Sequence, residues 1–395
     1  MDIALTGRPR PDRTSSPRAA EASAPPRLRV LVVGGGIGGL ATALALGRRG
    51  HDVLVLEQRP TLTESGAGIR LAPRDFQLLH VLGVGDAVRN RSLALDAFQV
   101  RDGSTGDLIG SVTLPASPAH ATAHRLDVYE PLLEACWELG SVELRTHSRV
   151  VGCVQEGGAV RATLADGSHV TGDALILTDG TCADARRDAE GGRGTPGERL
   201  AVYRATVPMD AVADRWQESA AVCWVGRDWH LSHYPLPDHR YLSLTATLHH
   251  HTGAGLHGAR VGLGEVLGAF PGVGPAARDV LTTGRHWRAL TLPGGPAAAD
   301  RVSGRTARVG DTGHGAHRSD AACPHQALED AVALGESCDV SGAGVHGWLA
   351  DYDVRRGERV RQSRAEHGFR YGEDRWTDDL ALVGHVLSKD SAGSC

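Results

Sequence analysis

Apolar residues along the chain fall into short continuous runs separated by stretches with helical spacing, a pattern typical of a sheet covered by helices. Residues 30–33 (VLVV) and 53–56 (VLVL) are two such runs, and their length suits buried strands of a parallel sheet. The stretch between them starts with glycines and continues with apolar residues, which predicts a helix beginning near Ile37. The pattern therefore predicts a βαβ unit over residues 30–57.

The turn between the first run and the predicted helix has the glycine spacing of a dinucleotide-binding unit. Gly34, Gly36 and Gly39 have no side chain to keep a pyrophosphate away, and the free N–H groups of the helix start would attract its charge. Glu57 ends the second run, where an acid can hold a ribose hydroxyl. We expect these four residues to bind a dinucleotide; the competing interpretation is a helix that only packs closely on a strand.

The remaining pattern predicts a discontinuous nucleotide-binding domain with a second sheet inserted into it. A helix is expected from about Asp127 to Leu139, strands follow it, and three more strand candidates lie within residues 200–250. A sheet beside a nucleotide domain would form a substrate cleft. The expected division is a disordered leader over 1–27, a nucleotide-binding domain of 28–72, 120–187 and 300–340, a substrate domain of 73–119 and 188–299, a C-terminal helix over 341–375 and a tail over 376–395.

Composition narrows the range of partners. The formal net charge is -5 with acids and bases spread along the chain, which argues against nucleic acid and favours a small-molecule partner. No apolar run reaches the length of a membrane span, and residues 1–27 lack the hydrophobic segment of a signal peptide, so we expect a cytoplasmic protein. The seven cysteines contain no CxxC pair, which argues against a disulfide framework. The oligomeric state stays open.

Two further motifs follow the glycine turn in order. They are DALILTDGTCADARR at residues 173–187 and GRTARVGDTGHG at residues 304–315. With the glycine turn they resemble the class A FAD-dependent aromatic hydroxylases, a monooxygenase family, and within it the salicylate-hydroxylase-like branch. The resemblance covers residues 28–372. It implies an α/β fold with a Rossmann-like FAD-binding domain of the glutathione-reductase type, an inserted mixed β-sheet substrate domain and C-terminal helices.

The resemblance also implies a cofactor, an electron donor and site residues. FAD would lie with its adenine end on the glycine turn, Arg125 and Asp179 would contact the flavin, and Asp311 would hold its ribityl chain. NADH or NADPH would supply electrons. The expected activity is transfer of one oxygen atom from O2 to an aromatic or polyketide-like small molecule.

The chain departs from the family where the flavin ring is expected. Family members have a Gly-x-Gly-x-Asn turn before the next helix, whereas this chain has Ala321, Ala322, Cys323, Pro324 and His325. Proline has no N–H, and alanine or cysteine does not readily take the positive φ angles that glycine tolerates. An alternative function is therefore a non-redox step, such as cyclisation or rearrangement of a natural-product intermediate, and a third is a binding protein without catalysis.

The segment WHLSHYPL supplies the candidate catalytic residues. Strand alternation would send His230 and Tyr234 to one face and His233 to the other. A neutral imidazole in the cleft could take the proton of a phenol or act as the base in a cyclisation, so His230 and His233 are both candidates. The competing interpretation is a hydrogen-bonded sheet histidine. Arg204, on the preceding strand, would suit a carboxylate substrate.

Metal-ligand residue types gather after the third motif. They are His314, His317, Cys323 and His325. Their spacing matches no known metal site, and the resemblance already accounts for the segment, so we expect no metal.

Overall fold

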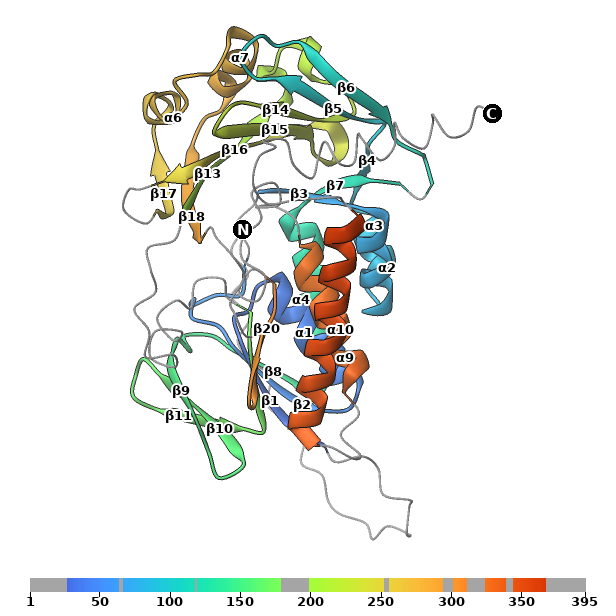
Figure 1. The fold of residues 1–395 in the computed structure, drawn as a ribbon, viewed down its shortest axis with the longest axis vertical. Coiled ribbons are helices and arrows are strands. Elements are labelled where there is room, and N and C mark those ends of the chain that lie inside the picture. The colour runs from blue at the N-terminus through green and yellow to red at the C-terminus, as the bar shows by residue number, and fades with distance from the viewer. Residues whose placement is uncertain are drawn as a thin grey trace.

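The computed structural model describes residues 27–63, 67–117, 119–178, 199–251, 256–293, 301–310, 324–338 and 344–366. These residues form two parts that lie one above the other in Figure 1, each built on its own large sheet. The lower part contains a six-stranded sheet with helices, and the upper part contains an eight-stranded sheet. A small three-stranded sheet lies where the two parts meet (Figure 1).

The six-stranded sheet is built around β1, whose last four residues are buried. Strand β1 pairs in parallel with β2 on one side and β12 on the other, and β8 and β20 extend the parallel sheet. Strand β19 is antiparallel to β20 at one edge. In sheet order the strands are β19 (Val302–Ser303), β20 (Thr306–Arg308), β12 (Ala174–Leu177), β1 (Arg29–Val33), β2 (Asp52–Leu56) and β8 (Val142–Arg145).

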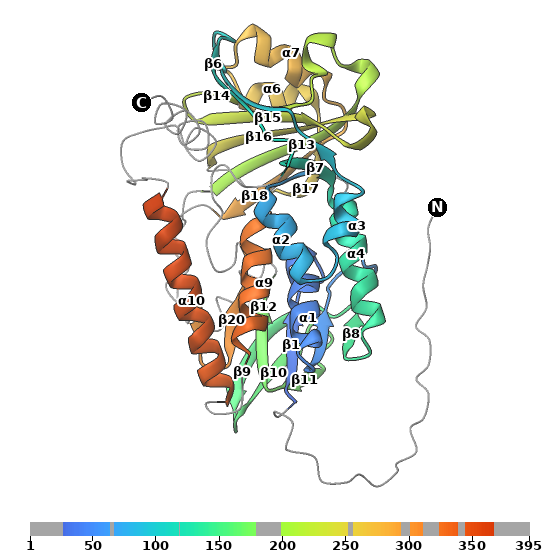
Figure 2. The same ribbon diagram turned by 90° about the vertical axis from the view of Figure 1, so that its right-hand side faces the viewer.

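Both faces of this sheet are covered, which explains the continuous apolar runs of its strands. Val30 and Val32 face the helices, whereas Leu31 and Val33 pack against a three-stranded antiparallel sheet. Figure 2 shows the helices standing below the eight-stranded sheet. The helices are α1 (Ile37–Arg48), α2 (Pro73–Val81), α3 (Gly85–Arg89), α4 (Arg125–Glu138), α9 (His325–Ser337) and α10 (Gly344–Glu366), and the covering strands are β9 (Val150–Glu156), β10 (Ala159–Leu164) and β11 (His169–Gly172).

The eight-stranded sheet is mostly antiparallel, with β5 parallel to β14 as the exception. Its outer face packs on two short helices, α6 (Leu263–Ala269) and α7 (Pro275–Thr283), in a core rich in tryptophan. In sheet order the strands are β17 (His257–Val261), β18 (Trp287–Pro293), β13 (Arg199–Pro208), β16 (Tyr241–His251), β15 (Trp229–Pro235), β14 (Ala220–Val225), β5 (Ala97–Asp102) and β6 (Leu108–Thr113).

The small sheet connects the two parts. It consists of β3 (Gly68–Leu71), β7 (Ala121–His124) and β4 (Leu93–Ala94), with β7 in the centre. On β3, Ile69 and Leu71 point into the core of the lower part. A Cβ built on Gly68 would lie 2.8 Å from Cε2 of Tyr234 and would also collide with Ser243. The backbone of β3 therefore lies directly on the inner face of the eight-stranded sheet.

One part of the expected domain division needs correction. The division above places residues 73–119 in the substrate domain, but α2 and α3 at the start of this range pack in the lower core, to which Phe76, Leu79 and Val88 contribute. The helical spacing of their apolar residues is visible in the sequence, but it does not tell which of two cores the helices join. Strands β5 and β6 of the same range do belong to the eight-stranded sheet.

The expected helix at 127–139 is α4, which begins two residues earlier, and helix α7 has no counterpart in the sequence prediction. Residues 1–26 and 367–395 lie outside the described residues. Within the part of the chain that the structure describes, no helix is both long and apolar enough to cross a membrane.

Candidate cofactor and substrate site

The glycine turn after β1 has the shape that a dinucleotide requires. Gly34 has a φ of +103°, which a residue with a side chain rarely adopts. A Cβ on Gly39 would lie 2.9 Å from the carbonyl carbon of Gly34 and closer still to its oxygen, so only glycine lets α1 begin this close to the turn. A Cβ on Gly36 would meet nothing within 4 Å. The turn is thus tightly packed on its inner side and open at Gly36.

The start of α1 has backbone N–H groups available for a ligand. Gly36 is the N-cap residue of α1, and no side chain caps this end. Free N–H groups and the positive end of the helix dipole favour a phosphate here. The open space beside Gly36 gives that phosphate access, so the turn fits the pyrophosphate of a dinucleotide such as FAD.

Glu57 lies beside the turn, as its place at the end of β2 predicts. Its Oε2 accepts a hydrogen bond from the N–H of Gly35 at 2.7 Å, and its Oε1 accepts one from the N–H of Arg59 at 2.8 Å. The Thr178 hydroxyl donates to the carbonyl of Val33 at 2.8 Å and ties the end of β12 to the end of β1. Thr178 therefore supports the turn.

Of the other three residues expected to bind the cofactor, the structure describes only Arg125. Asp179 and Asp311 lie outside the described residues; they directly follow Thr178 and Gly310, at the ends of β12 and of the segment after β20. Arg125 is the first residue of α4, and its N–H donates to the carbonyl of Ala67 at 2.9 Å. The structure thus places Arg125 beside the start of β3, near the junction of the two parts.

The inner face of the eight-stranded sheet carries a row of polar side chains. His230 opposes Thr247, Ser232 opposes Thr245, and Tyr234 opposes Ser243, so all six side chains share one face. Arg204 also opposes Thr245, from the other side of β16. Because β3 lies on Tyr234 and Ser243, this face is the one that looks toward the lower part.

One cation near this face was missed by the sequence analysis. Arg70 projects from β3 on the side opposite Ile69 and Leu71, and its guanidinium carbon lies 5.6 Å from the centre of the Phe98 ring. Phe98 packs in the same small core as Tyr234. In the sequence, Arg70 is marked only by its place after the glycine turn at residues 66–68. Predicting the direction of its side chain would have required strand alternation on a strand of four residues.

Burial and Arg70 together set the ionisation of His230. Burial lowers the pKa of His230 most, the nearby charge of Arg70 lowers it further, and the result is about 4. Burial raises the pKa of Tyr234, and the charges of Arg70, Arg204 and Arg125 oppose that rise. At neutral pH the face therefore carries a neutral imidazole, a neutral phenol and several cations. Such a face can accept a proton and attract an anion.

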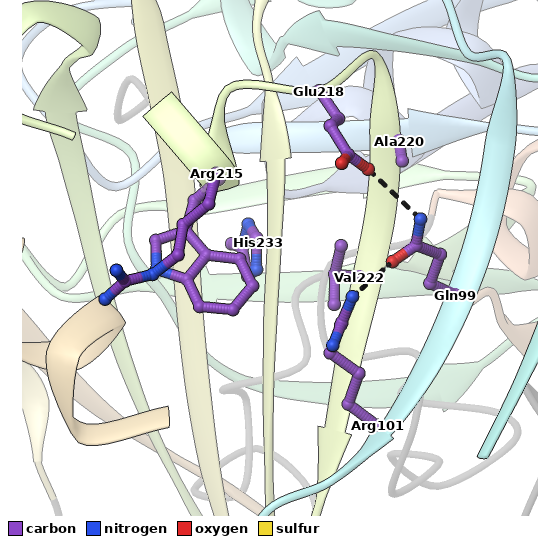
Figure 3. A pocket seen from close by; sticks show the side chains of 8 residues that line it. Gln99, Arg101, Arg215, Glu218, Ala220, Val222 and His233 are labelled. Carbon is purple, nitrogen blue, oxygen red and sulfur yellow. Dashed lines mark hydrogen bonds between the residues drawn. The ribbon is translucent and has the colours of Figure 1, made fainter. Parts of the chain in front are cut away.

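His233, the second candidate, lies on the outer face of the sheet. Its ring is 6.2 Å from that of Trp224 and 6.0 Å from that of Trp216. Burial, and then the charge of Arg101, lower its pKa to about 3, and neither ring nitrogen has a hydrogen-bond partner in the described structure. Figure 3 shows His233 and Arg101 among the residues that line a small pocket on this face. The two histidines are therefore on opposite faces.

Metal ligands are not gathered in the part of the chain that the structure describes, since no group of three or more His, Cys, Asp or Glu side chains there could hold an ion. Of the four candidate ligands after the third motif, only His325 is described; His314, His317 and Cys323 lie outside the described residues, as do Ala321 and Ala322.

The fold and the glycine turn define an α/β protein that binds a dinucleotide and carries a second sheet over the cofactor domain. Residues 27–238 match the model of the FAD binding domain. The chain is similar to the 3-hydroxybenzoate 6-hydroxylase of Polaromonas naphthalenivorans (strain CJ2), with 35% identity over 325 residues that cover 80% of each chain. The 3-hydroxybenzoate 6-hydroxylase of Klebsiella oxytoca is 33% identical over 377 residues, 92% of this chain and 94% of the relative.

Solved structures agree on the fold. Salicylate hydroxylase in a substrate complex superposes with a TM-score of 0.68 at 23% identity, covering 92% of this chain and 94% of the other. This protein belongs to the class A FAD-dependent aromatic hydroxylases, a family of flavoprotein monooxygenases. The expected family, fold class and FAD cofactor are thereby confirmed, and the substrate class is an aromatic small molecule.

Proposed function

We propose that this protein hydroxylates a phenolic acid with electrons from NADH or NADPH, and that His230 accepts the proton of the phenol. The observation that carries the proposal is a buried neutral histidine on the inner sheet face, with Arg70 and Arg204 on or beside that face. FAD, when bound at the glycine turn, would supply the redox chemistry for placing one oxygen atom of O2 on the aromatic ring. The protein's own groups bind, orient and deprotonate the substrate.

Proton transfer to His230 makes the substrate more reactive. A phenolate ring is richer in electrons than a phenol ring and therefore accepts an electrophilic oxygen atom more readily. His230 is neutral at pH 7 because its pKa is about 4, so one of its two ring nitrogens carries no proton, which is the form a general base needs. A base with this pKa is weak, however, and must become stronger when the substrate binds.

Substrate charge provides that change. A carboxylate placed beside Arg70 offsets the cationic charge that lowers the pKa of His230. The smaller part of the lowering, which Arg70 causes, is then removed while the larger part caused by burial remains, so the pKa rises and His230 becomes a better proton acceptor when an anionic substrate is present. This coupling favours phenolic acids over neutral phenols, in agreement with the 3-hydroxybenzoate named for two similar proteins.

The first experiment tests turnover. The purified protein with FAD is given 3-hydroxybenzoate, and oxygen uptake is measured with NADH and with NADPH. Substrate-dependent oxygen uptake and a hydroxylated product support the proposal. If the protein binds FAD and is reduced by the nicotinamide, yet turns over neither 3-hydroxybenzoate nor related phenolic acids, the proposed substrate class is wrong. Product formation without oxygen would favour the non-redox alternative.

The second experiment tests Arg70 with a control on the opposite face. Arg70→Met should weaken the binding of 3-hydroxybenzoate by about 10- to 100-fold, the range of a lost charge-assisted hydrogen bond, and should leave 3-hydroxybenzyl alcohol nearly unaffected. Arg101→Met is the matched control, because Arg101 lies beside His233 on the outer face. Equal losses in both variants, or equal losses for both ligands, would contradict the role of Arg70.

A further inference from the structure

His325 lies at a wall of the cofactor site. It is the first residue of α9, which follows Pro324 and has no side-chain cap. In the same turn, the Cβ of Ala327 lies 3.1 Å from the place of a Cβ on Gly38 and 3.2 Å from that of a Cβ on Gly310. The first turn of α9 therefore packs on the first turn of α1 and on the residue that precedes Asp311.

Two carboxylates face the two ring nitrogens of His325. Its Nδ1 lies 2.6 Å from Oδ1 of Asp75, and its Nε2 lies 3.5 Å from Oε1 of Glu329, one helical turn further along α9. Asp75 is fully buried, and its other oxygen accepts the N–H of Ala72 at the start of α2. A carboxylate is only an acceptor, so an imidazole between two carboxylates is satisfied when both its nitrogens carry protons.

Among the described residues, a charged His325 balances the groups around this bridge. Glu329 also binds Arg74 of α2 and, at 2.6 Å, Arg356 of α10. Arg356 further binds Asp330, whose Oδ2 accepts the N–H of Gly310 at 2.7 Å. The three carboxylates of this network, Asp75, Glu329 and Asp330, meet two arginines, and a protonated His325 supplies the third cation.

The pKa of His325 agrees with this count. Burial by itself would lower it, but the hydrogen bonds to Asp75 and Glu329 and their charges raise it to about 9. Burial would raise the pKa of Glu329, yet His325 and Arg356 hold it well below its usual range. His325 is therefore charged and can donate to both carboxylates around neutral pH, and it loses its charge and one of its two donors when the pH rises through about 9.

We propose that His325 is a positioning residue for FAD: its imidazolium fastens the first turn of α9 to Asp75 of α2 and so keeps this wall of the cofactor site in place. Loss of the proton leaves Asp75 buried without its cation, which favours separation of α2 from α9. Since α9 packs on the first turn of α1, FAD affinity depends on the charge of His325. The family membership of the chain does not provide this role, because His325 belongs to the segment that departs from the family turn.

FAD affinity measured as a function of pH tests the proposal. The dissociation constant is determined by the change in FAD fluorescence between pH 7 and pH 10.5 for the wild type and for His325→Gln. If one proton on His325 is needed, the wild-type affinity falls by about tenfold per pH unit above pH 9. Ionisation of FAD itself acts equally on both proteins, so the ratio of their dissociation constants isolates the histidine.

The variant should bind FAD more weakly than the wild type at pH 7, and the difference should vanish above pH 10. His346→Gln, which replaces an exposed histidine on α10, is the control and should behave as the wild type. A constant ratio across the pH range, or equal affinities at pH 7, overturns the proposal. If His325→Gln does not fold, Asp75→Asn gives the same comparison, and a wild-type affinity that is flat between pH 8 and pH 10.5 overturns the proposal by itself. Substrate turnover does not enter this test, so failure of the proposed function leaves it unaffected.

Discussion

Two glycines in the same turn should respond to the same substitution in opposite ways. In Gly39→Ala the new Cβ would lie 2.9 Å from the carbonyl carbon of Gly34, closer still to its oxygen, and 3.0 Å from Oγ1 of Thr178. Carbon atoms in contact are normally about 3.5–4.0 Å apart. The obstacle is backbone rather than a flexible side chain, so α1 would have to move away from β1. We expect a loss of at least about 3 kcal/mol in the free energy of unfolding.

Gly36→Ala should leave the fold almost unchanged and weaken the binding of FAD. Its Cβ would meet nothing within 4 Å, and the backbone at φ -80° and ψ -174° is accessible to alanine. Alanine is a poorer N-cap than glycine, but it lowers the entropy of the unfolded chain, and the two effects, each below about 1 kcal/mol, largely cancel. The methyl group does enter the space that the pyrophosphate needs, so we expect FAD affinity to fall by about 10- to 100-fold, equivalent to about 1.4–2.8 kcal/mol.

Two assays separate these effects. Urea unfolding of the FAD-free proteins, followed by circular dichroism, gives stability, and fluorescence titration with FAD gives affinity. The expected pattern is an unstable Gly39→Ala and a stable Gly36→Ala that binds FAD poorly. If Gly36→Ala binds FAD as tightly as the wild type, the cofactor does not approach the start of α1. If the two variants are equally stable, the packing argument at Gly39 is wrong.

Three further changes test other parts of the structure. His233→Leu removes a buried imidazole that has no hydrogen-bond partner in the described structure. The free energy of unfolding at pH 7 should stay the same or rise by up to about 1 kcal/mol, and turnover should be unchanged; a loss above about 2 kcal/mol in urea unfolding would contradict this. Because the pKa values of His230 and His233 are lowered to about 4 and about 3, the unfolded state takes up protons below pH 6.5 that the folded state does not. Unfolding free energy should thus fall by up to about 1.4 kcal/mol per pH unit for each histidine between pH 6.5 and about 4, and by less in His233→Leu; a flat profile would refute the assignment. Arg356→Gln removes a buried cation shared by Glu329 and Asp330 and should cost about 3–5 kcal/mol, whereas Arg355→Gln, at an exposed pair with Asp351, should change stability by at most about 0.5 kcal/mol in thermal melts; equal effects would contradict the burial argument.

The βαβ unit could be predicted because its information is local. The start of α1 at Ile37 and the place of Glu57 beside the turn follow from residues within one short stretch of chain. Strand alternation likewise places His230 and His233 on opposite faces, since it depends only on their spacing along one strand. It does not tell which histidine faces the cofactor domain, because that depends on β3, which packs on Tyr234 and Ser243 from more than 150 positions earlier in the chain.

Contacts between distant residues explain what the sequence analysis missed. Asp75 and His325 are 250 positions apart, and each looks ordinary in its own segment, one at the start of a helix and the other in a divergent turn. Arg70 lies on a strand of four residues, too short for a pattern to fix its direction. These groups act through their charges on residues of other elements. The distances between the charges and those residues are set by the tertiary fold and not by any local pattern.

The segment from Gly68 to Asp75 belongs to both sites. Gly68 lets β3 lie on the inner sheet face, and the charge of Arg70 lowers the pKa of His230. Asp75 binds His325 at the wall of the cofactor site. The intervening Ile69 and Leu71 are fixed in the lower core. The charges of Arg70 and Asp75 both act on His120, whose pKa is lowered by burial and by Arg70 and raised by Asp75. One segment of eight residues therefore contributes both to the substrate face and to the cofactor wall, although the two sites are built on different sheets.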